Sequence, residues 1–281
     1  MTGLTWQCRE RTIDLKRPVV MGILNVTPDS FSDGGRYADI EEALERALAM
    51  QAEGAAIIDV GGESTRPGAD PVDEQTELDR VIPLIERLAP CCSAAISVDT
   101  SKLAVMQAAV AAGASIVNDV RALRAPGARA WAADSGVGVC LMHMQGEPRT
   151  MQEHPRYHDV LAEVAEFLLA ERAACLKAGI AHAAIALDPG LGFGKNHEHN
   201  LALLKHLSHL AALGSPLLVG VSRKSLIGRV LGRAPHERLF GGLGLAAWAV
   251  ASGASVVRTH EVAPTQDAMR MVSAVIEGAV E

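Results

Sequence analysis

The chain has 281 residues, a length that suits either one large α/β barrel or two ordinary domains. About 49% of the residues are apolar but only 3% are aromatic, a mixture typical of buried parallel strands flanked by helices. The formal net charge of −7 is spread along the chain rather than gathered in runs, which argues against a nucleic-acid-binding surface.

Short β-branched runs alternate with longer helical patterns about eight times along the chain. The predicted strands span residues 19–24, 55–60, 95–99, 115–118, 138–142, 185–188, 216–220 and 255–258. The predicted helices span residues 40–53, 74–88, 102–112, 128–135, 157–177, 197–213, 236–251 and 264–279. Regular strand–helix alternation predicts a parallel sheet, and eight units favour a closed (β/α)₈ TIM barrel over an open sheet.

Glycines mark the ends of most predicted helices. Six of them follow a helical run and precede a strand, where a left-handed residue ends a helix without a steric penalty: Gly54, Gly113, Gly136, Gly179, Gly214 and Gly253. No Pro/Ser-rich linker divides the chain. We therefore expect one domain over residues 1–281, with the barrel from about residue 18 and an N-terminal β-hairpin closing its bottom.

The cysteines and the N-terminus indicate a cytoplasmic protein. Five cysteines form no CxxC pair and no zinc-like spacing, so we interpret them as core residues in a reducing compartment: Cys8, Cys91, Cys92, Cys140 and Cys175. Residues 1–11 lack the apolar run of a signal peptide. The longest apolar stretch, 243–257, is interrupted by serine and glycine and is shorter than the roughly 20 residues of a membrane span.

Polar residues end nearly every predicted strand. Active sites of such barrels lie at the C-terminal ends of the strands. Capping of the following helices accounts for one or two such residues, but not for all of them. In chain order they are Asn25, Asp59, Asp99, Asn118 with Asp119, His143, Asp188, the run Ser222, Arg223, Lys224, and Arg258 with His260.

Two long loops, residues 27–35 and 61–69, follow the first two strands and are rich in turn residues. Loops of this length in a compact barrel are usually lids or binding loops, so we expect them to close when ligand binds. Arg66 stands beside glycines and hydroxyl groups, a setting that suits a diphosphate. The alternative is a surface loop whose arginine faces water.

Arg258 and His260 end the eighth strand directly before the last predicted helix. Barrels often bind phosphate near their last strands and a helix N-terminus, so this pair is a candidate anion clamp. Residues 188–195, DPGLGFGK, have neither the Walker spacing nor a GxGxxG fingerprint after the first strand. Nucleotide binding is therefore not expected.

Four longer strings, residues 22–34, 59–68, 188–195 and 222–225, resemble the dihydropteroate synthase family. Shorter matches at 97–100, 118–120, 141–144 and 258–260 extend the resemblance over the whole chain, without a departure at these positions. The resemblance implies a transferase of folate biosynthesis. It would join 6-hydroxymethyl-7,8-dihydropterin diphosphate to 4-aminobenzoate by an SN1-like displacement, with Mg²⁺ as cofactor, as a cytoplasmic homodimer.

The same resemblance implies roles for individual residues. It implies a pterin pocket of Asp99, Asn118, Met142, Asp188 and Lys224. It implies a diphosphate site of Asn25, Thr65, Arg66, Arg258 and His260, with Asn25 as the Mg²⁺ ligand. It implies a 4-aminobenzoate pocket of Phe31, Thr65, Arg66, Pro67, Phe193 and Ser225. The residues implied in catalysis are Asn25, Asp99, Lys224, Arg258 and His260.

The chemistry of the pterin agrees with this set. An aminopyrimidinone edge presents several N–H donors and one carbonyl, so it calls for carboxylate and amide acceptors plus one cationic donor. Two alternatives stay open. One is a pterin-dependent methyltransferase that acts on a corrinoid, and the other is a catalytically silent pterin-binding barrel.

Overall fold

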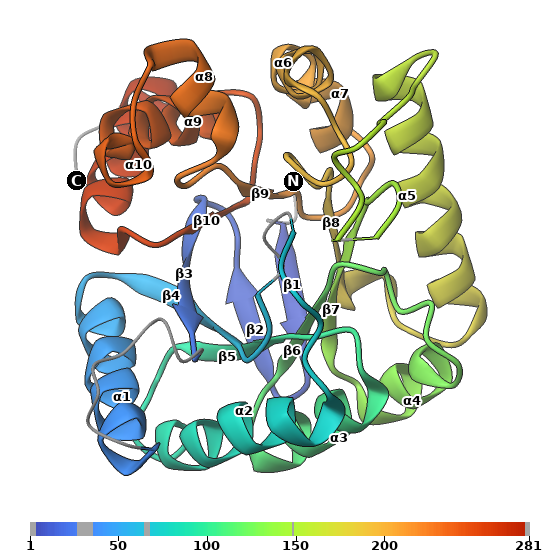
Figure 1. Cartoon of the computed structure of the whole chain (residues 1–281), viewed down its shortest axis with the longest axis vertical. Coiled ribbons are helices and arrows are strands. Elements are labelled where there is room, and N and C mark those ends of the chain that lie inside the picture. Colours follow the sequence, from blue (N-terminus) through green and yellow to red (C-terminus); the bar gives the residue numbers. More distant parts are fainter. Residues whose placement is uncertain (1–3, 27–35, 65–67, 148, 279–281) are drawn as a thin grey trace.

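The computed structural model describes residues 4–26, 36–64, 68–147 and 149–278. Eight parallel strands form one sheet, and helices surround it (Figure 1). The strands are β3 Val19–Asn25, β4 Ala55–Gly61, β5 Ala95–Asp99, β6 Ile116–Asp119, β7 Gly138–Met142, β8 Ile185–Asp188, β9 Leu218–Gly220 and β10 Val256–Thr259.

The strand order closes the sheet into a barrel. It runs β8-β7-β6-β5-β4-β3-β10-β9, with parallel pairing between neighbours. A parallel bridge between Leu187 and Leu217 joins the two ends, and the N–H of Leu187 donates to the carbonyl of Pro216 at 2.9 Å. The predicted (β/α)₈ barrel is confirmed.

The helices bury apolar stripes against the barrel. In α2, Glu74–Leu88, the buried Val81, Leu84, Ile85 and Leu88 recur at helical spacing. The other helices are α1 Arg36–Ala52, α3 Leu103–Ala112, α4 Ala128–Ser135, α5 Val160–Lys177, α6 His197–Lys205, α7 Leu207–Ala211, α8 Ser225–Leu231, α9 Leu239–Ala251 and α10 Val262–Glu277, with 3₁₀ turns η2 His182–Ala184 and η3 Pro235–Glu237. No helix in the described ranges combines the length and apolarity needed to cross a membrane.

Several predicted helix bounds are wrong for local reasons. The helix predicted from residue 157 begins at Val160, because the Asp159 side chain accepts the N–H groups of Leu161 and Ala162 and caps it. The helix predicted over 197–213 is interrupted at His206. The helix predicted from 236 follows the η3 turn, and the seven-residue α8 is too short to show a period. The six glycines named above all have positive φ, as predicted.

The N-terminal hairpin closes the bottom of the barrel, as predicted. Its strands, β1 Thr5–Cys8 and β2 Arg11–Asp14, are antiparallel. Trp6 is fully buried, and its indole N–H donates to the carbonyl of Ala184, just before β8. Hairpin side chains share one buried apolar cluster with early residues of all eight strands: Met21, Ile57, Ala95, Ile116, Cys140, Ala186, Leu218 and Val256. The opposite end is therefore where a ligand can enter.

Four of the five cysteines are core residues, as predicted, and all five are free thiols. Burial raises the pKa of Cys8 to about 12 and that of Cys175 to about 11, so these thiols stay protonated and unreactive. Cys91 is exposed, so the prediction is wrong there. It lies just after α2, where the chain turns at the surface.

Candidate active site

A cleft of about 630 Å³ opens at the C-terminal ends of the strands. Strand residues and residues from the β8–α6 and β9–α8 connections line it together. Its lining includes seven predicted site residues: Asn25, Asp99, Phe193, Lys224, Ser225, Arg258 and His260. Asn118, Met142 and Asp188 are buried at the ends of the neighbouring strands β6, β7 and β8. The structure thus brings together residues that lie up to 235 positions apart (25 to 260).

An arginine held by two carboxylates lies at the centre of this mouth. Arg258 Nε is 2.6 Å from Asp59 Oδ2, and its Nη2 is 2.7 Å from Asp99 Oδ2. Asn118 Nδ2 donates to the same Asp59 oxygen at 3.1 Å. Four strands therefore meet in one polar network. Asp59 is fully buried, and its Oδ1 makes no hydrogen bond within the part of the chain that the structure describes.

The network shifts the ionisation of its members. Burial raises the pKa of Asp99 to about 7, although the Arg258 charge opposes the shift. Burial alone lowers the pKa of Arg258, but Asp59 and Asp99 outweigh it and raise that pKa above its ordinary value. Arg258 therefore stays charged, while Asp99 titrates near neutral pH.

Asp59 is central to this network, although the sequence predicts it only as a polar strand end. A signal was present, because an acidic side chain inside the run AAIIDVG occupies a strand that is otherwise apolar and buried. A charge in such a place needs a partner, and the partner is Arg258.

Lys224 and Asp188 form the opposite side of the mouth. Asp188 Oδ1 accepts the N–H of Gly190 at 2.7 Å. The ammonium of Lys224 lies 4.6 Å from the centroid of the Phe193 ring. Burial lowers the pKa of Lys224 to about 8 although Asp188 opposes the shift, and burial raises the pKa of Asp188. Arg223, just before Lys224, has the left-handed φ of 55°, which is rare for a residue with a side chain.

His260 is held by a serine and a glutamate. Its Nδ1 is 2.8 Å from Ser222 Oγ, which is 2.9 Å from Glu261 Oε2. The Ser222 hydroxyl has a single proton, which it donates to Glu261, so its oxygen accepts from Nδ1–H of His260. His260 therefore carries a proton on Nδ1, and Ser222 is not arranged as a nucleophile activated by this histidine.

The predicted 4-aminobenzoate pocket is described only in part. Phe193 packs against an apolar cluster of Val120, Met142, Met144 and Met151. Ser225 is the first residue of α8 and lines the cleft beside Lys224. Phe31, Thr65, Arg66 and Pro67 lie outside the described residues, and so does the predicted closure of the two loops.

Comparison with known proteins agrees with this geometry. Residues 21–260 match the family described as pterin binding enzyme. The chain is 52% identical over 265 residues to the dihydropteroate synthase of Escherichia coli (strain K12), covering 94% of each sequence. It is 48% identical over 278 residues to that of Neisseria meningitidis serogroup B. The chain belongs to the dihydropteroate synthase family.

Solved structures of family members share the fold over nearly the full length. The Yersinia pestis dihydropteroate synthase in a sulfonamide drug complex has a TM-score of 0.92 at 49% identity, covering 97% of this chain and 99% of that one. The Xanthomonas albilineans enzyme with 4-aminobenzoic acid has a TM-score of 0.93 at 48% identity, covering 100% of both. The latter enzyme in complex with 7,8-dihydropteroate has a TM-score of 0.88 at 45% identity, covering 99% of this chain and all of that chain.

The donor set for Mg²⁺ is small. Asn25 is the last residue of β3, and a Cβ on Gly61 would lie 3.6 Å from both its Oδ1 and the Cβ of Asp99. Within the described ranges, no group of three or more His, Cys, Asp and Glu residues is arranged to hold a metal ion. One neutral amide oxygen suits Mg²⁺ when water and phosphate oxygens supply the other ligands. The residues therefore fit an ion that arrives with a diphosphate.

Proposed function

We propose that this chain catalyses the reaction of its family, in which 6-hydroxymethyl-7,8-dihydropterin diphosphate and 4-aminobenzoate give 7,8-dihydropteroate and diphosphate. One observation carries the proposal. The polar set Asp99, Asn118, Asp188, Lys224 and Arg258 converges on one barrel mouth, in a chain about half identical to dihydropteroate synthases. A relative of the same fold holds 7,8-dihydropteroate.

The buried end of the cleft suits the pterin. Asp99 and Asp188 accept from N–H groups of the aminopyrimidinone edge, and Lys224 donates to its carbonyl. Asn118 is already held by Asp59 at 3.1 Å, so its amide is oriented before ligand binds. Met142 is buried beside Asp188 in the strand register and supplies an apolar wall.

The chemical step replaces a C–O bond by a C–N bond. The bond from the pterin methylene carbon to the diphosphate oxygen breaks with its electron pair staying on oxygen. The amine nitrogen then donates its lone pair to the carbon and releases one proton to solvent. Because the arylamine is a modest nucleophile, departure of the diphosphate is where stabilisation is needed most. An ionised Asp99 stabilises the positive charge that develops on the pterin.

Arg258 connects the buried carboxylates of the pocket to the leaving diphosphate. Two of its five N–H donors bind Asp59 and Asp99, and the other three make no hydrogen bond to a residue that the structure describes, so they are offered to the leaving diphosphate. His260 lies at the same side of the cleft, oriented by Ser222. Asn25 would hold Mg²⁺, which supplies further positive charge against the diphosphate when it is bound.

The outer part of the cleft suits 4-aminobenzoate. Phe193 offers an aromatic face, and Ser225 offers a hydroxyl for the carboxylate. Thr65, Arg66, Pro67 and Phe31 complete this pocket in the proposal, although they lie outside the described residues. The 4-aminobenzoic acid complex of a relative supports this assignment.

The test is release of diphosphate by the purified protein. We expect release only when both substrates and Mg²⁺ are present. A corrinoid methyltransferase would instead transfer a methyl group without diphosphate, and a silent barrel would bind pterin diphosphate in titration calorimetry without turnover. Either of those results would overturn the proposal.

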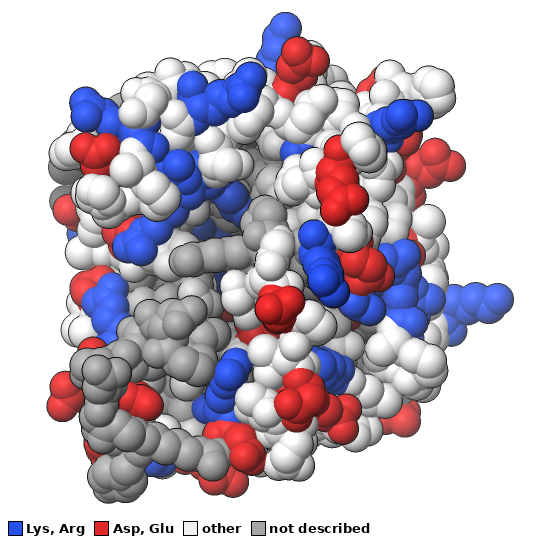
Figure 2. Space-filling view, viewed as in Figure 1, with Lys and Arg blue, Asp and Glu red and all other residues white. Residues whose placement is uncertain are grey.

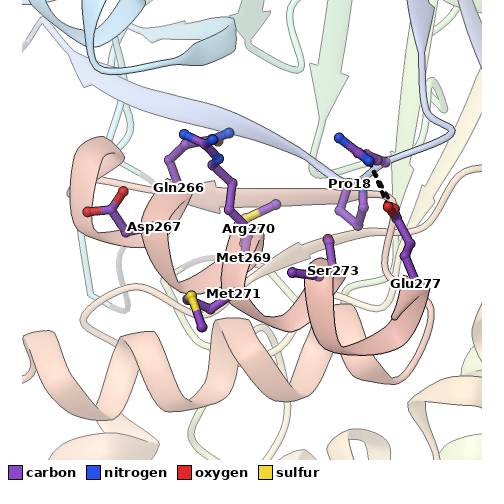
Figure 3. A pocket seen from close by; sticks show the side chains of 10 residues that line it. Pro18, Gln266, Asp267, Met269, Arg270, Met271, Ser273 and Glu277 are labelled. Carbon is purple, nitrogen blue, oxygen red and sulfur yellow. Dashed lines mark hydrogen bonds and ion pairs between the residues drawn. The ribbon is translucent and has the colours of Figure 1, made fainter. Parts of the chain in front are cut away.

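We also propose a homodimer formed through α9 and α10. Large apolar side chains on these helices are exposed: Phe240 and Trp248 on α9, and Met271, Val275 and Ile276 on α10. A hollow of about 440 Å³ runs along α10 and is lined by Met269, Arg270 and Ser273 (Figure 3). The Arg17–Glu277 ion pair bounds it at one end. Apolar patches of this kind commonly mark interfaces.

Sedimentation tests the dimer. We expect a two-chain particle that the double variant Met271→Glu and Val275→Glu converts to one chain, because a buried unpaired carboxylate is costly. A wild-type protein that sediments as one chain would contradict the proposal.

We also propose a cytoplasmic location, because all five cysteines are free thiols and four of them are buried, as is usual in a reducing compartment.

A further inference from the structure

The glycine-rich segment after β8 ends in a lysine that the proposed reaction does not use. Lys195 is only 2% exposed. Its Nζ is 2.8 Å from His143 Nδ1, 3.0 Å from the Gly190 carbonyl, 3.0 Å from the Phe193 carbonyl and 3.3 Å from the His143 carbonyl. This lysine of DPGLGFGK therefore points into the protein and binds the loop that precedes it.

Two glycines allow the close backbone approach that gathers carbonyl groups around the Lys195 ammonium. Gly190 and Gly194 have φ of 64° and 61°, and an added Cβ would lie 1.9 Å from the His143 carbonyl and 2.2 Å from the Gln145 carbonyl. The loop backbone thus lies directly on the chain leaving β7. Three carbonyl groups converge at this seam beside His143 Nδ1, and the three N–H donors of an ammonium are shared among these four acceptors.

The charge at this position is costly to keep. Burial lowers the pKa of Lys195 to about 7, and Lys224 adds to the shift while Asp188 opposes it. Burial also lowers the pKa of His143 to about 3, so this ring is neutral and its Nδ1 accepts from the ammonium. An apolar side chain in the same space would avoid desolvating a charge but would leave the carbonyls of His143, Gly190 and Phe193 without this donor. The contribution of Lys195 must therefore lie in the loop conformation that its hydrogen bonds hold.

That loop carries Phe193, whose ring packs on the ammonium of Lys224 at 4.6 Å. Lys195 binds the carbonyl of Phe193 itself, so it acts on the backbone from which the ring projects. Other side chains hold the remaining loop: Asn200 accepts the Gly192 N–H at 2.7 Å, and Tyr157 donates to the Gly194 carbonyl at 2.8 Å. Loss of Lys195 should therefore displace Phe193 locally without unfolding the loop.

We propose that Lys195 is a positioning residue that sets Phe193 against Lys224 and thereby determines affinity for the arylamine. This inference rests on the proposed function, in which Phe193 contacts 4-aminobenzoate and Lys224 contacts the pterin.

The first experiment compares Lys195→Met with Lys205→Met, the same substitution at an exposed lysine of α6. We expect Lys195→Met to raise the KM for 4-aminobenzoate by about 10-fold while kcat stays within about threefold, because binding of this substrate is what changes. Lys205→Met should match the wild type in both. An unchanged KM in folded Lys195→Met overturns the proposal, as does a loss confined to kcat.

A double-mutant cycle separates this inference from the proposed function. Phe193→Ala alone should raise the same KM by about 10-fold, and Lys195→Met should then add less than about twofold in that background, because both act through one ring. If Phe193→Ala has no effect, the proposed pocket is wrong. If Phe193→Ala has its effect but the two changes multiply, the pocket stands and the role of Lys195 is wrong.

A second variant covers the case in which Lys195→Met does not fold. Lys195→Gln keeps two N–H donors but no charge, so it binds fewer of the converging carbonyls. We expect the KM for 4-aminobenzoate to rise by about three- to fivefold, between wild type and Lys195→Met. A KM equal to that of the wild type would overturn the proposal.

Discussion

At the scale of single residues, burial at the barrel mouth sets the ionisation of the groups that bind ligand. It raises the pKa of Asp99 to about 7 and lowers that of Lys224 to about 8. A pterin needs Asp99 ionised as an acceptor and Lys224 protonated as a donor. Both conditions hold together only between these two values.

The affinity for pterin should therefore follow a bell-shaped pH profile. It falls below about pH 7 because Asp99 gains a proton, and above about pH 8 because Lys224 loses one. Titration calorimetry with a pterin that lacks the diphosphate measures this directly. Asp99→Asn should weaken binding throughout and reduce the acid limb to the contribution of Asp188, whose pKa burial also raises, while Asp134→Asn, at an exposed position of α4, should change neither. A flat wild-type profile would contradict the assignment.

Arg258 should matter for both rate and stability. Arg258→Ala removes a preorganised donor to the leaving diphosphate, so kcat should fall on the order of 10²-fold or more at saturating Mg²⁺. It also leaves the buried Asp59 and Asp99 without their partner, which costs about 3–5 kcal/mol of unfolding free energy. Kinetics and urea denaturation measure the two effects separately. Normal turnover in the folded variant would place the anion clamp elsewhere.

At the scale of elements, a lysine joins the start of the β4–α2 loop to α2 and to the start of α3. Lys102, the residue before α3, forms ion pairs with Glu63 after β4 and with Glu77 in α2. Glu77 is fully buried. The ion pairs therefore hold Glu63 just before the residues 65–67 that the 4-aminobenzoate pocket is proposed to use.

Lys102→Met should destabilise the fold by about 3–5 kcal/mol, because it leaves the Glu77 carboxylate buried and unpaired. Adding Glu77→Gln should recover part of that loss, because the uncompensated charge is gone. Chemical denaturation of the two variants and the wild type provides the comparison. Equal stability of the single and double variants would show that this charge is not what the lysine balances.

At the scale of the whole molecule, the two ends of the barrel have separate tasks. The hairpin and the early strand residues form an apolar floor, whereas the opposite ends hold the polar site. Figure 2 shows lysine and arginine side chains gathered over the region where Figure 1 places α8 and α9. Acidic side chains are scattered over the rest of that face. A mouth with basic neighbours suits two anionic substrates in a protein of net charge −7.

This division predicts that substitutions in the apolar cluster at the bottom of the barrel lower stability and leave pterin affinity unchanged. Trp6→Ala should cost about 3–5 kcal/mol, since Trp6 is fully buried and bonded to the Ala184 carbonyl. The pterin affinity of the folded variant should match that of the wild type. Thermal unfolding and titration calorimetry on one preparation check both. A large loss of pterin affinity would mean that floor and mouth are coupled.

The sequence by itself determined the barrel, the hairpin, the glycine helix ends and most polar strand ends. Periodicity and residue type are local, and a parallel strand places its last residue at one edge whatever its neighbours are. The break at His206, the short α8 and the cap at Asp159 were missed, because packing and single hydrogen bonds decide them. Only the closed barrel pairs Asp59 with Arg258, 199 residues apart, joins Ser222 to His260 and Glu261, and turns Lys195 inward. Such contacts depend on how the strands are arranged around the barrel, and no local pattern records that.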